Sequence, residues 1–151
     1  MPANDHHHHD IETLGLALLT VSSTRGHTQD PSGDTAVTIT EEAGHHVIHR
    51  DICRDEVVPI QRTVKRFVSD EAVDVAVTMG GTGVTPDDVT PEAVSALFDR
   101  RLPGFGERFR TRSVEDIGER VIASRATGGI VHGVPVFCVP GSKGAVRLAM
   151  A

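Results

Sequence analysis

The feature that most constrains the fold is a strand pattern that runs directly into a glycine-rich turn, in residues 73–94 (VDVAVTMGGTGVTPDDVTPEAV). Its first residues are mostly β-branched and apolar, which is typical of a strand covered on both faces of a sheet. Gly80, Gly81 and Gly83 then let the backbone turn sharply at the carboxyl end of this strand. Because open α/β sheets bind their ligands at that edge, the stretch predicts both a fold class and the place of a site.

An acidic segment follows the turn. It contains Asp87, Asp88 and Thr90, and Pro91 is well placed for the first turn of a helix. Backbone N–H groups beside carboxylates could hold phosphates together with a bridging Mg²⁺. A glycine-rich turn of this length is equally a plain connection between strand and helix, and the residues alone leave both interpretations open.

Strand and helix patterns alternate along the rest of the chain. We expect further strands at residues 14–21, 45–51, 127–131 and 134–139, and helices at 34–43, 56–68, 91–98, in a short stretch ending near 110, at 114–123 and after 142. Such alternation predicts an α/β protein with a mostly parallel sheet covered on both faces, formed by one domain.

Local signals suggest where several helices begin and end. Ser32 is a candidate N-cap for the helix at 34–43, and Gly44 a candidate stop. The run at 102–107 (LPGFGE) predicts a break in the chain, and Ser113 with Asp116 resembles a capping box that would open a new helix.

Composition excludes several classes of protein. The 151 residues suit a single core, and a net charge of −6 without a basic stripe or aromatic platform argues against nucleic-acid binding. No apolar run approaches the roughly 18 residues of a membrane span, and no signal-peptide core is present, so we expect a cytoplasmic protein. Cys53 and Cys138 lack metal-ligand spacing and are expected to be free thiols, buried or half-buried.

Two groups of histidines invite a metal-binding interpretation. The tract at 6–9 lies in a low-complexity terminus with nothing to fix its geometry, so residues 1–12 are expected to form a disordered tail before a domain at 13–151. The histidines of 45–51 (HHVIHRD) are better explained as the polar face of an edge strand.

Seven motifs occur in order along the chain. They are VSSTRG (21–26), DPSG (30–33), MGGTG (79–83), DVTPEA (88–93), PGFGERFR (103–110), SRATGGI (124–130) and VPGSKGAVRLA (139–149). Together they resemble the MoaB/MogA family of molybdenum-cofactor biosynthesis proteins, and MoaB more than MogA. The resemblance spans the chain from Leu14 onward and implies a three-layer αβα sandwich that assembles as a homotrimer or as a hexamer, a dimer of trimers.

The resemblance also implies an activity. MogA-like and archaeal MoaB-like proteins are molybdopterin adenylyltransferases, which use Mg²⁺ and ATP to transfer AMP to the terminal phosphate of molybdopterin and release pyrophosphate. The product would pass to a MoeA-like insertion protein. Some bacterial MoaB proteins have no established activity, so a non-catalytic molybdopterin-binding or scaffold protein is the alternative. A generic dinucleotide-binding domain is disfavoured because Ser22-Ser23-Thr24 stands where GxGxxG would follow the first strand.

Candidate site residues follow from the same match. Asp55 and Asp88 are the expected catalytic residues on the Mg²⁺ side, with helix capping as the alternative for Asp55. The residues expected to contact the pterin or the phosphates are Ser22, Asp30, Ser32, Gly33, Gly80, Gly81, Thr82, Gly83, Thr90, Ser124, Arg125, Pro140, Gly141, Ser142 and Lys143. For Arg125 a solvated charge remains the alternative.

The chain departs from the family pattern at two places. Asp87 stands where many members carry a basic residue, and the chain ends at Ala151 without the LPELxH-type extension that is common among MoaB relatives.

Overall fold

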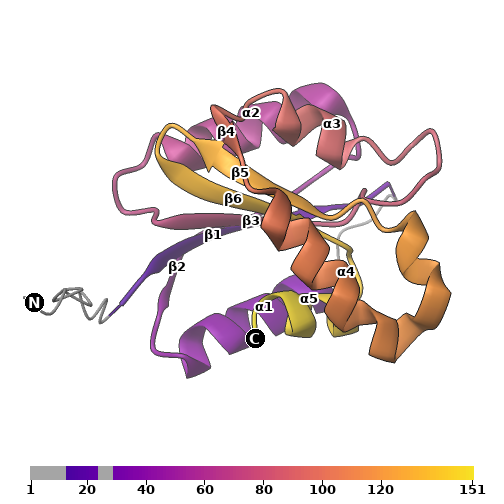
Figure 1. Cartoon of the computed structure of the whole chain (residues 1–151). Coiled ribbons are helices and arrows are strands. Elements are labelled where there is room, and N and C mark those ends of the chain that lie inside the picture. The colour runs from indigo at the N-terminus through magenta and orange to yellow at the C-terminus, as the bar shows by residue number, and fades with distance from the viewer. Residues whose placement is uncertain (1–12, 24–28) are drawn as a thin grey trace, which may run out of the picture.

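A computed structural model describes residues 13–23 and 29–151, so the predicted tail at 1–12 and the loop residues 24–28 lie outside the described residues. Six strands form one sheet in the order β2-β1-β3-β6-β5-β4 (Figure 1). Their bounds are β1 (Gly15–Val21), β2 (His46–Cys53), β3 (Val75–Met79), β4 (Arg100–Arg101), β5 (Thr127–Val131) and β6 (Val134–Val139). The strands β2, β1, β3 and β6 are mutually parallel, whereas β5 and β4 run antiparallel to their neighbours.

Helices cover both faces of this sheet, which confirms the predicted three-layer fold (Figure 1). On one face lie α2 (Val57–Val68) and α3 (Thr90–Ser95), and on the other α1 (Pro31–Glu42), α4 (Pro103–Ile117) and α5 (Lys143–Ala149). A 3₁₀ helix, η1 (Gly118–Ala123), continues from α4 beyond the carboxyl edge of the parallel strands.

Two apolar cores fill the spaces between the layers. Ala17, Leu19 and Val21 of β1 face the α2 side, where Phe67 is fully buried. Leu16 and Leu18 of the same strand face α1 and α5 on the other side. A strand packed on both faces needs apolar side chains at every position, which explains the unbroken run that identified β1 in the sequence.

The edge strand β2 is half-exposed and uses its histidines structurally. His49 stacks on Phe67 with ring centroids 5.5 Å apart, and its Nε2 lies 2.7 Å from Asp70 Oδ2. The pKa of Asp70 is lowered, first by the Ala72 N–H and then by His49. Nδ1 of His45, just before the strand, accepts a hydrogen bond of 3.1 Å from the Leu14 N–H. The edge-strand prediction is therefore confirmed.

The prediction of two short helices around residues 103–123 is wrong. α4 runs unbroken from Pro103 to Ile117, because a proline in the first turn starts a helix rather than interrupting it. Ser113 lies buried within α4 and donates its hydroxyl to the Phe109 carbonyl at 2.7 Å, so it opens no capping box. Position 106 requires glycine even inside the helix, because a Cβ there would lie 2.6 Å from the carbonyl oxygen of Ala126.

The strands β5 and β6 confirm the predictions at 127–131 and 134–139, and they pair as an antiparallel hairpin. His132 and Gly133 both have positive φ, 49° and 79°, as two-residue hairpin turns of the primed type require. The strand β4 was not predicted, because its two residues are too short to show a pattern.

Both cysteines are free among the described residues, as expected. Burial is the main cause that raises the pKa of Cys53 to about 11 and that of Cys138 to about 12, so both thiols stay protonated at neutral pH.

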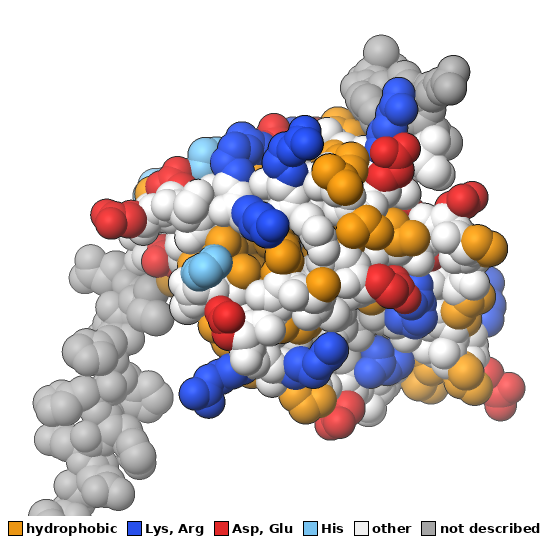
Figure 2. Space-filling model, turned by 90° about the horizontal axis from the view of Figure 1, so that it is seen from above, with side chains coloured by type: hydrophobic (Ala, Val, Ile, Leu, Met, Phe, Trp, Pro, Cys, Tyr) orange, Lys and Arg blue, Asp and Glu red, His pale blue; other side chains and the backbone are white. Residues whose placement is uncertain are grey.

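Charged side chains of both signs are interspersed on the face that carries α2 and α3, with hydrophobic groups between them (Figure 2). No helix within residues 13–23 and 29–151 is long and apolar enough to cross a membrane.

Candidate functional site

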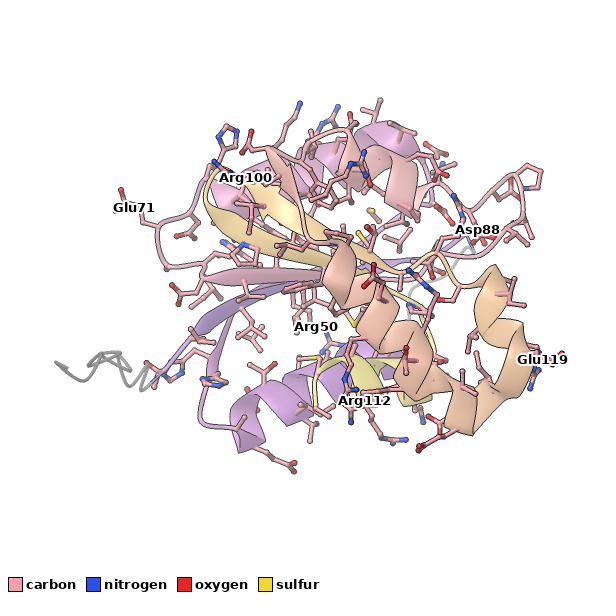
Figure 3. The ribbon with its side chains drawn as sticks, viewed as in Figure 1. Arg50, Glu71, Asp88, Arg100, Arg112 and Glu119 are labelled. Carbon is pink, nitrogen blue, oxygen red and sulfur yellow. The ribbon has the colours of Figure 1, made fainter. Side chains whose placement is uncertain are left out.

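The carboxyl ends of four parallel strands bring the predicted site segments together. The Ser22 N–H, just after β1, donates to the Cys53 carbonyl at the end of β2 at 3.0 Å. The Gly80 N–H, just after β3, donates to the Val139 carbonyl at the end of β6 at 2.9 Å. In Figure 3, Asp88 lies at this edge, on the same side of the molecule as Glu119 of η1, whereas Glu71 marks the opposite edge.

The glycine turn after β3 is tightly enclosed by neighbouring elements. Gly80 has φ 109° and a Cβ there would collide with the carbonyl oxygen of Val21. Gly81 has φ 71° and a Cβ there would collide with Thr90 Oγ1 and lie 2.8 Å from Asp55 Oδ1. Only glycine fits these positions, because they combine a left-handed backbone with a close approach.

Asp55 reaches this turn from the loop before α2. Its Oδ1 accepts a hydrogen bond of 3.2 Å from the Val89 N–H, and no side chain caps α2, whose N-cap position is occupied by Glu56. The helix-capping alternative for Asp55 is therefore wrong. Burial raises the pKa of Asp55, and the carboxylates of Asp88 and Asp87 add to the rise, against the lowering effect of the Val89 N–H.

Asp88 has the opposite electrostatic environment. Its Oδ2 accepts hydrogen bonds from the Thr85 hydroxyl at 2.7 Å and from the Thr85 N–H at 3.0 Å. The Thr85 hydroxyl is the main cause that lowers the pKa of Asp88, helped by backbone N–H groups of Thr85 and Gly83 and by the charge of Arg125. Two carboxylates therefore flank one glycine turn, one with a raised pKa and one with a lowered pKa.

Arg125 lies beside the same loop, in the segment between η1 and β5. Its backbone N–H donates to the Thr82 carbonyl at 3.0 Å, and its side chain contacts Gly83, Asp88 and Glu92. Ser124 precedes it, with a buried hydroxyl that has no partner among the described residues. The structure thus brings Ser124 and Arg125 to the glycine turn.

The DPSG motif lies on the other side of the turn, at the start of α1. Asp30 is the N-cap of this helix: its Oδ1 accepts from the Gly33 N–H at 3.0 Å, and the Thr20 hydroxyl donates to both of its oxygens. The prediction of Ser32 as N-cap is wrong, because α1 begins earlier, at Pro31. The Ser32 hydroxyl instead donates to the Gly141 carbonyl, which ties α1 to the loop after β6.

A hollow of about 250 Å³ lies between these elements. It is lined by Thr20, Val21, Ser22, Gln29, Asp30, Pro31, Ser32, Ile52, Met79 and Gly141. A wider groove of about 1080 Å³ adjoins it, and Lys143 lies on its wall. Ser142 caps α5 through a 3.1 Å hydrogen bond from the Ala145 N–H. Gly80 of the glycine turn packs closely against the loop after β6, since a Cβ on Gly141 would be 3.2 Å from the Cα of Gly80.

Four site residues were missed from the sequence: Thr20, Arg50, Thr85 and Glu92. Thr85 carries a usable signal, because a threonine three residues before an aspartate is the pattern of a local side-chain-to-backbone turn. Arg50 donates to Asp34 at 2.7 Å and to Asp30 at 3.3 Å, contacts that join β2 to the start of α1. Nothing in the sequence indicates such a pairing across elements.

The donor set around the turn suits a small hard cation. Among the described residues, Oδ1 of Asp55 accepts a hydrogen bond and Oδ2 accepts none. The nearby Thr90 Oγ1 is buried, and it too has no hydrogen-bond partner among these residues. Mg²⁺ is commonly held by one or two carboxylates together with substrate phosphates rather than by a cage of protein ligands. Accordingly, no group of three or more His, Cys, Asp or Glu within the described ranges is placed to hold a metal by itself.

The two carboxylates should affect stability in opposite directions. The folded protein binds a proton at Asp55 more tightly than the unfolded chain, so this group destabilises the fold as pH rises through its raised pKa. Asp55→Asn should therefore unfold at a higher temperature than wild type at pH 7. The difference in unfolding temperature should become smaller as the pH falls below the pKa of Asp55 in the folded protein. Asp88→Asn should unfold at a lower temperature, because its lowered pKa stabilises the fold above the unfolded value. Calorimetric scans from pH 3 to pH 8 would check both; equal shifts of one sign would contradict the two environments.

Comparison with known proteins agrees with this architecture. The family described as "probable molybdopterin binding domain" matches residues 12–151. Molybdenum cofactor biosynthesis protein B of Bacillus subtilis is 44% identical over 151 residues, covering 99% of this chain and 89% of the relative. Its Escherichia coli K12 counterpart is 41% identical over 134 residues, covering 89% of this chain and 79% of the relative.

Solved structures show the same fold. A crystal structure of molybdenum cofactor biosynthesis protein B superimposes with a TM-score of 0.87 at 47% identity, covering 91% of this chain and 86% of that chain. The tungsten cofactor synthesizing protein MoaB from Pyrococcus furiosus gives a TM-score of 0.83 at 34% identity, covering 92% and 89%. A MogA structure gives 0.80 at 29% identity, covering 90% and 89%.

Proposed function

This chain belongs to the family of probable molybdopterin binding domains and is similar to the MoaB proteins of molybdenum cofactor biosynthesis, and we propose that it adenylylates molybdopterin with ATP as the AMP donor. The observation that carries the proposal is the pair of carboxylates, Asp55 and Asp88, that flank one glycine turn with opposite pKa shifts. Titratable groups pushed apart in this way are common where a site divides chemical roles between similar side chains.

The reaction requires two anionic reactants to meet in line. An oxygen of the terminal phosphate of molybdopterin attacks the α-phosphorus of ATP, and the bond from that phosphorus to the bridging oxygen of the β-phosphate breaks as pyrophosphate leaves. The protein has little covalent work to do, so positioning and charge neutralisation dominate. When bound, Mg²⁺ supplies positive charge that neutralises the phosphate oxygens.

The described residues supply the remaining requirements. Asp88, ionised at neutral pH, and Asp55 would hold the cation between them, with the buried hydroxyl of Thr90 as a further oxygen beside Asp55. Backbone N–H groups of Gly80, Gly81, Thr82 and Gly83 would bind the nucleotide phosphates. The hollow beside Ser22, Ser32 and Gly141 would take the phosphate end of the pterin, and Lys143 offers a positive charge on the adjoining groove.

A non-catalytic molybdopterin-binding or scaffold role is favoured by one observation. Asp87, Asp88 and Glu92 all raise the pKa of Asp55, so the glycine turn lies in a negative field that a triphosphate must enter. A bound divalent cation would reverse that field, which makes binding of the two ligands interdependent. A protein that bound only the pterin would show no such dependence.

The test is detection of products from purified protein, ATP, MgCl₂ and molybdopterin, with adenylyl-molybdopterin followed by chromatography and pyrophosphate by ³¹P NMR. We expect both products in equal amounts, and neither after addition of EDTA. Molybdopterin that binds but is not adenylylated would leave the scaffold function. Sedimentation of the same sample would test the proposed homotrimer or dimer of trimers, and addition of a MoeA-like insertion protein would test the proposed partner.

A further inference from the structure

One arginine holds both ends of the loop that carries Asp88. Arg125 Nε donates to the Gly83 carbonyl at 2.7 Å, and Nη2 donates to the Asp88 carbonyl at 2.7 Å. The two carbonyls belong to the first and last residues of the 83–88 segment. Nη1 contacts Glu92 Oε1, so each of the three guanidinium nitrogens donates to a protein acceptor. The guanidinium therefore closes this segment as a clamp.

The clamp depends on the shape of arginine. A guanidinium is planar and directs several N–H donors at fixed angles, so it can set the separation of two carbonyl oxygens. A lysine ammonium is a point charge on a flexible stem and fixes no such separation. The Arg125 side chain is 33% exposed and the contacts lie at the edge of the site, where hydrogen bonds to a charged donor are shorter and stronger than neutral ones.

Within the 83–88 segment the chain is otherwise held by few contacts. Thr85 bonds Asp88, but both residues are members of the same segment, and Val84 is 68% exposed. The orientation of the Asp88 carboxylate relative to the glycine turn therefore depends on how the ends of the segment are held. Arg125 provides the only side-chain hydrogen bonds, among those of the described residues, that reach its backbone from outside the segment.

We propose that Arg125 is a positioning residue, which holds the 83–88 segment so that Asp88 faces the glycine turn, rather than a ligand of the substrate phosphates. The assignment rests on the proposed function insofar as Asp88 takes part in adenylyl transfer. It gives Arg125 a role different from the phosphate contact expected from its motif.

Two substitutions separate the shape of the side chain from its charge. Arg125→Lys keeps the charge and loses the fork, whereas Arg125→Gln loses both. Arg120→Gln is the matched control, because it removes one exposed charge from neighbouring η1. Within the part of the chain that the structure describes, the Arg120 side chain makes a single hydrogen bond, from Nε to the Ile117 carbonyl at 3.4 Å. Turnover of the control should equal that of wild type.

For both Arg125 variants we expect kcat to fall by about tenfold to a hundredfold with KM for ATP changed less than about threefold, as displacement of a catalytic group produces. A loss of kcat in Arg125→Gln alone, with Arg125→Lys at the wild-type value, would show that only the charge matters and would overturn the role of the guanidinium shape. A rise in KM for ATP at unchanged kcat would overturn the proposal and restore Arg125 as a phosphate ligand.

Amide hydrogen exchange keeps this test independent of the reaction. Exchange of residues 84–89 should accelerate at least about tenfold in both variants, while exchange in β1 and β3 stays at the wild-type rate. If wild type makes no adenylyl product, the proposed function fails, and exchange alone decides whether the clamp exists. Unchanged exchange in Arg125→Gln would overturn the proposal whatever the activity.

Discussion

Asp88→Asn is expected to reduce the rate of molybdopterin adenylylation by about 10²- to 10³-fold, the usual effect of removing one charged group that acts on a transition state. The substitution keeps the size of the side chain and its oxygen acceptor for Thr85, but removes the charge that the Thr85 hydroxyl and the nearby N–H groups stabilise. Turnover is measured as pyrophosphate release under saturating ATP and Mg²⁺.

Asp55→Asn should lose turnover to a similar extent while gaining stability, which separates a catalytic effect from damage to the fold. Asp87→Asn is the matched control: it removes the same charge one residue from Asp88, and among residues 13–23 and 29–151 no hydrogen bond or ion pair joins its side chain to the site. We expect its turnover to be at least that of wild type, because Asp87 adds to the negative field on Asp55. An equal loss in all three variants would indicate that only the total charge around the glycine turn matters, and full activity in Asp88→Asn would refute its catalytic role.

Gly80→Ala should cost the protein about 2–5 kcal/mol of unfolding free energy, the sum expected from a strained backbone and an overpacked contact. Its φ of 109° disfavours any residue with a Cβ, and the added methyl would collide with the backbone carbonyl of Val21, which cannot rotate away. Denaturant titration gives the difference directly.

Gly44→Ala serves as its matched control. Gly44 also has a positive φ, 84°, but a Cβ there meets nothing within 4 Å. Its cost should stay near about 1 kcal/mol, the backbone contribution alone. If the two variants lost equal stability, contact between β1 and the glycine turn would not be important for the fold.

The three layers and every described strand except β4 could be predicted from the sequence, because each of those strands carries a local signal. The runs at β1 and β3 are apolar on both faces, and the hairpin residues His132 and Gly133 mark a turn. The region around α4 was mispredicted because glycine and proline signals compete there: Pro103 opens a helix that the glycines at 104 and 106 only weaken.

The site was predicted residue by residue from its motifs, but its internal contacts were not. Asp55 and Val89 are 34 residues apart, and Arg125 and Gly83 are 42 apart, so no local pattern links them. The role of Asp30 was also hidden, since the same motif could either contact a ligand or cap a helix, and only the positions of Thr20 and Arg50 show that its oxygens are occupied.

The reversed direction of β5 has a consequence for how the site is assembled. The other site segments leave a strand at its carboxyl end, but Ser124 and Arg125 enter β5 at its amino end, opposite Cys138 of β6. If β5 were parallel to β6, its amino end would lie at the far edge of the sheet, about 16 Å away for five residues. The antiparallel direction of β5 thus returns a late part of the chain to the place where earlier parts meet. The direction of this one strand decides whether Arg125 can reach the loop that carries Asp88.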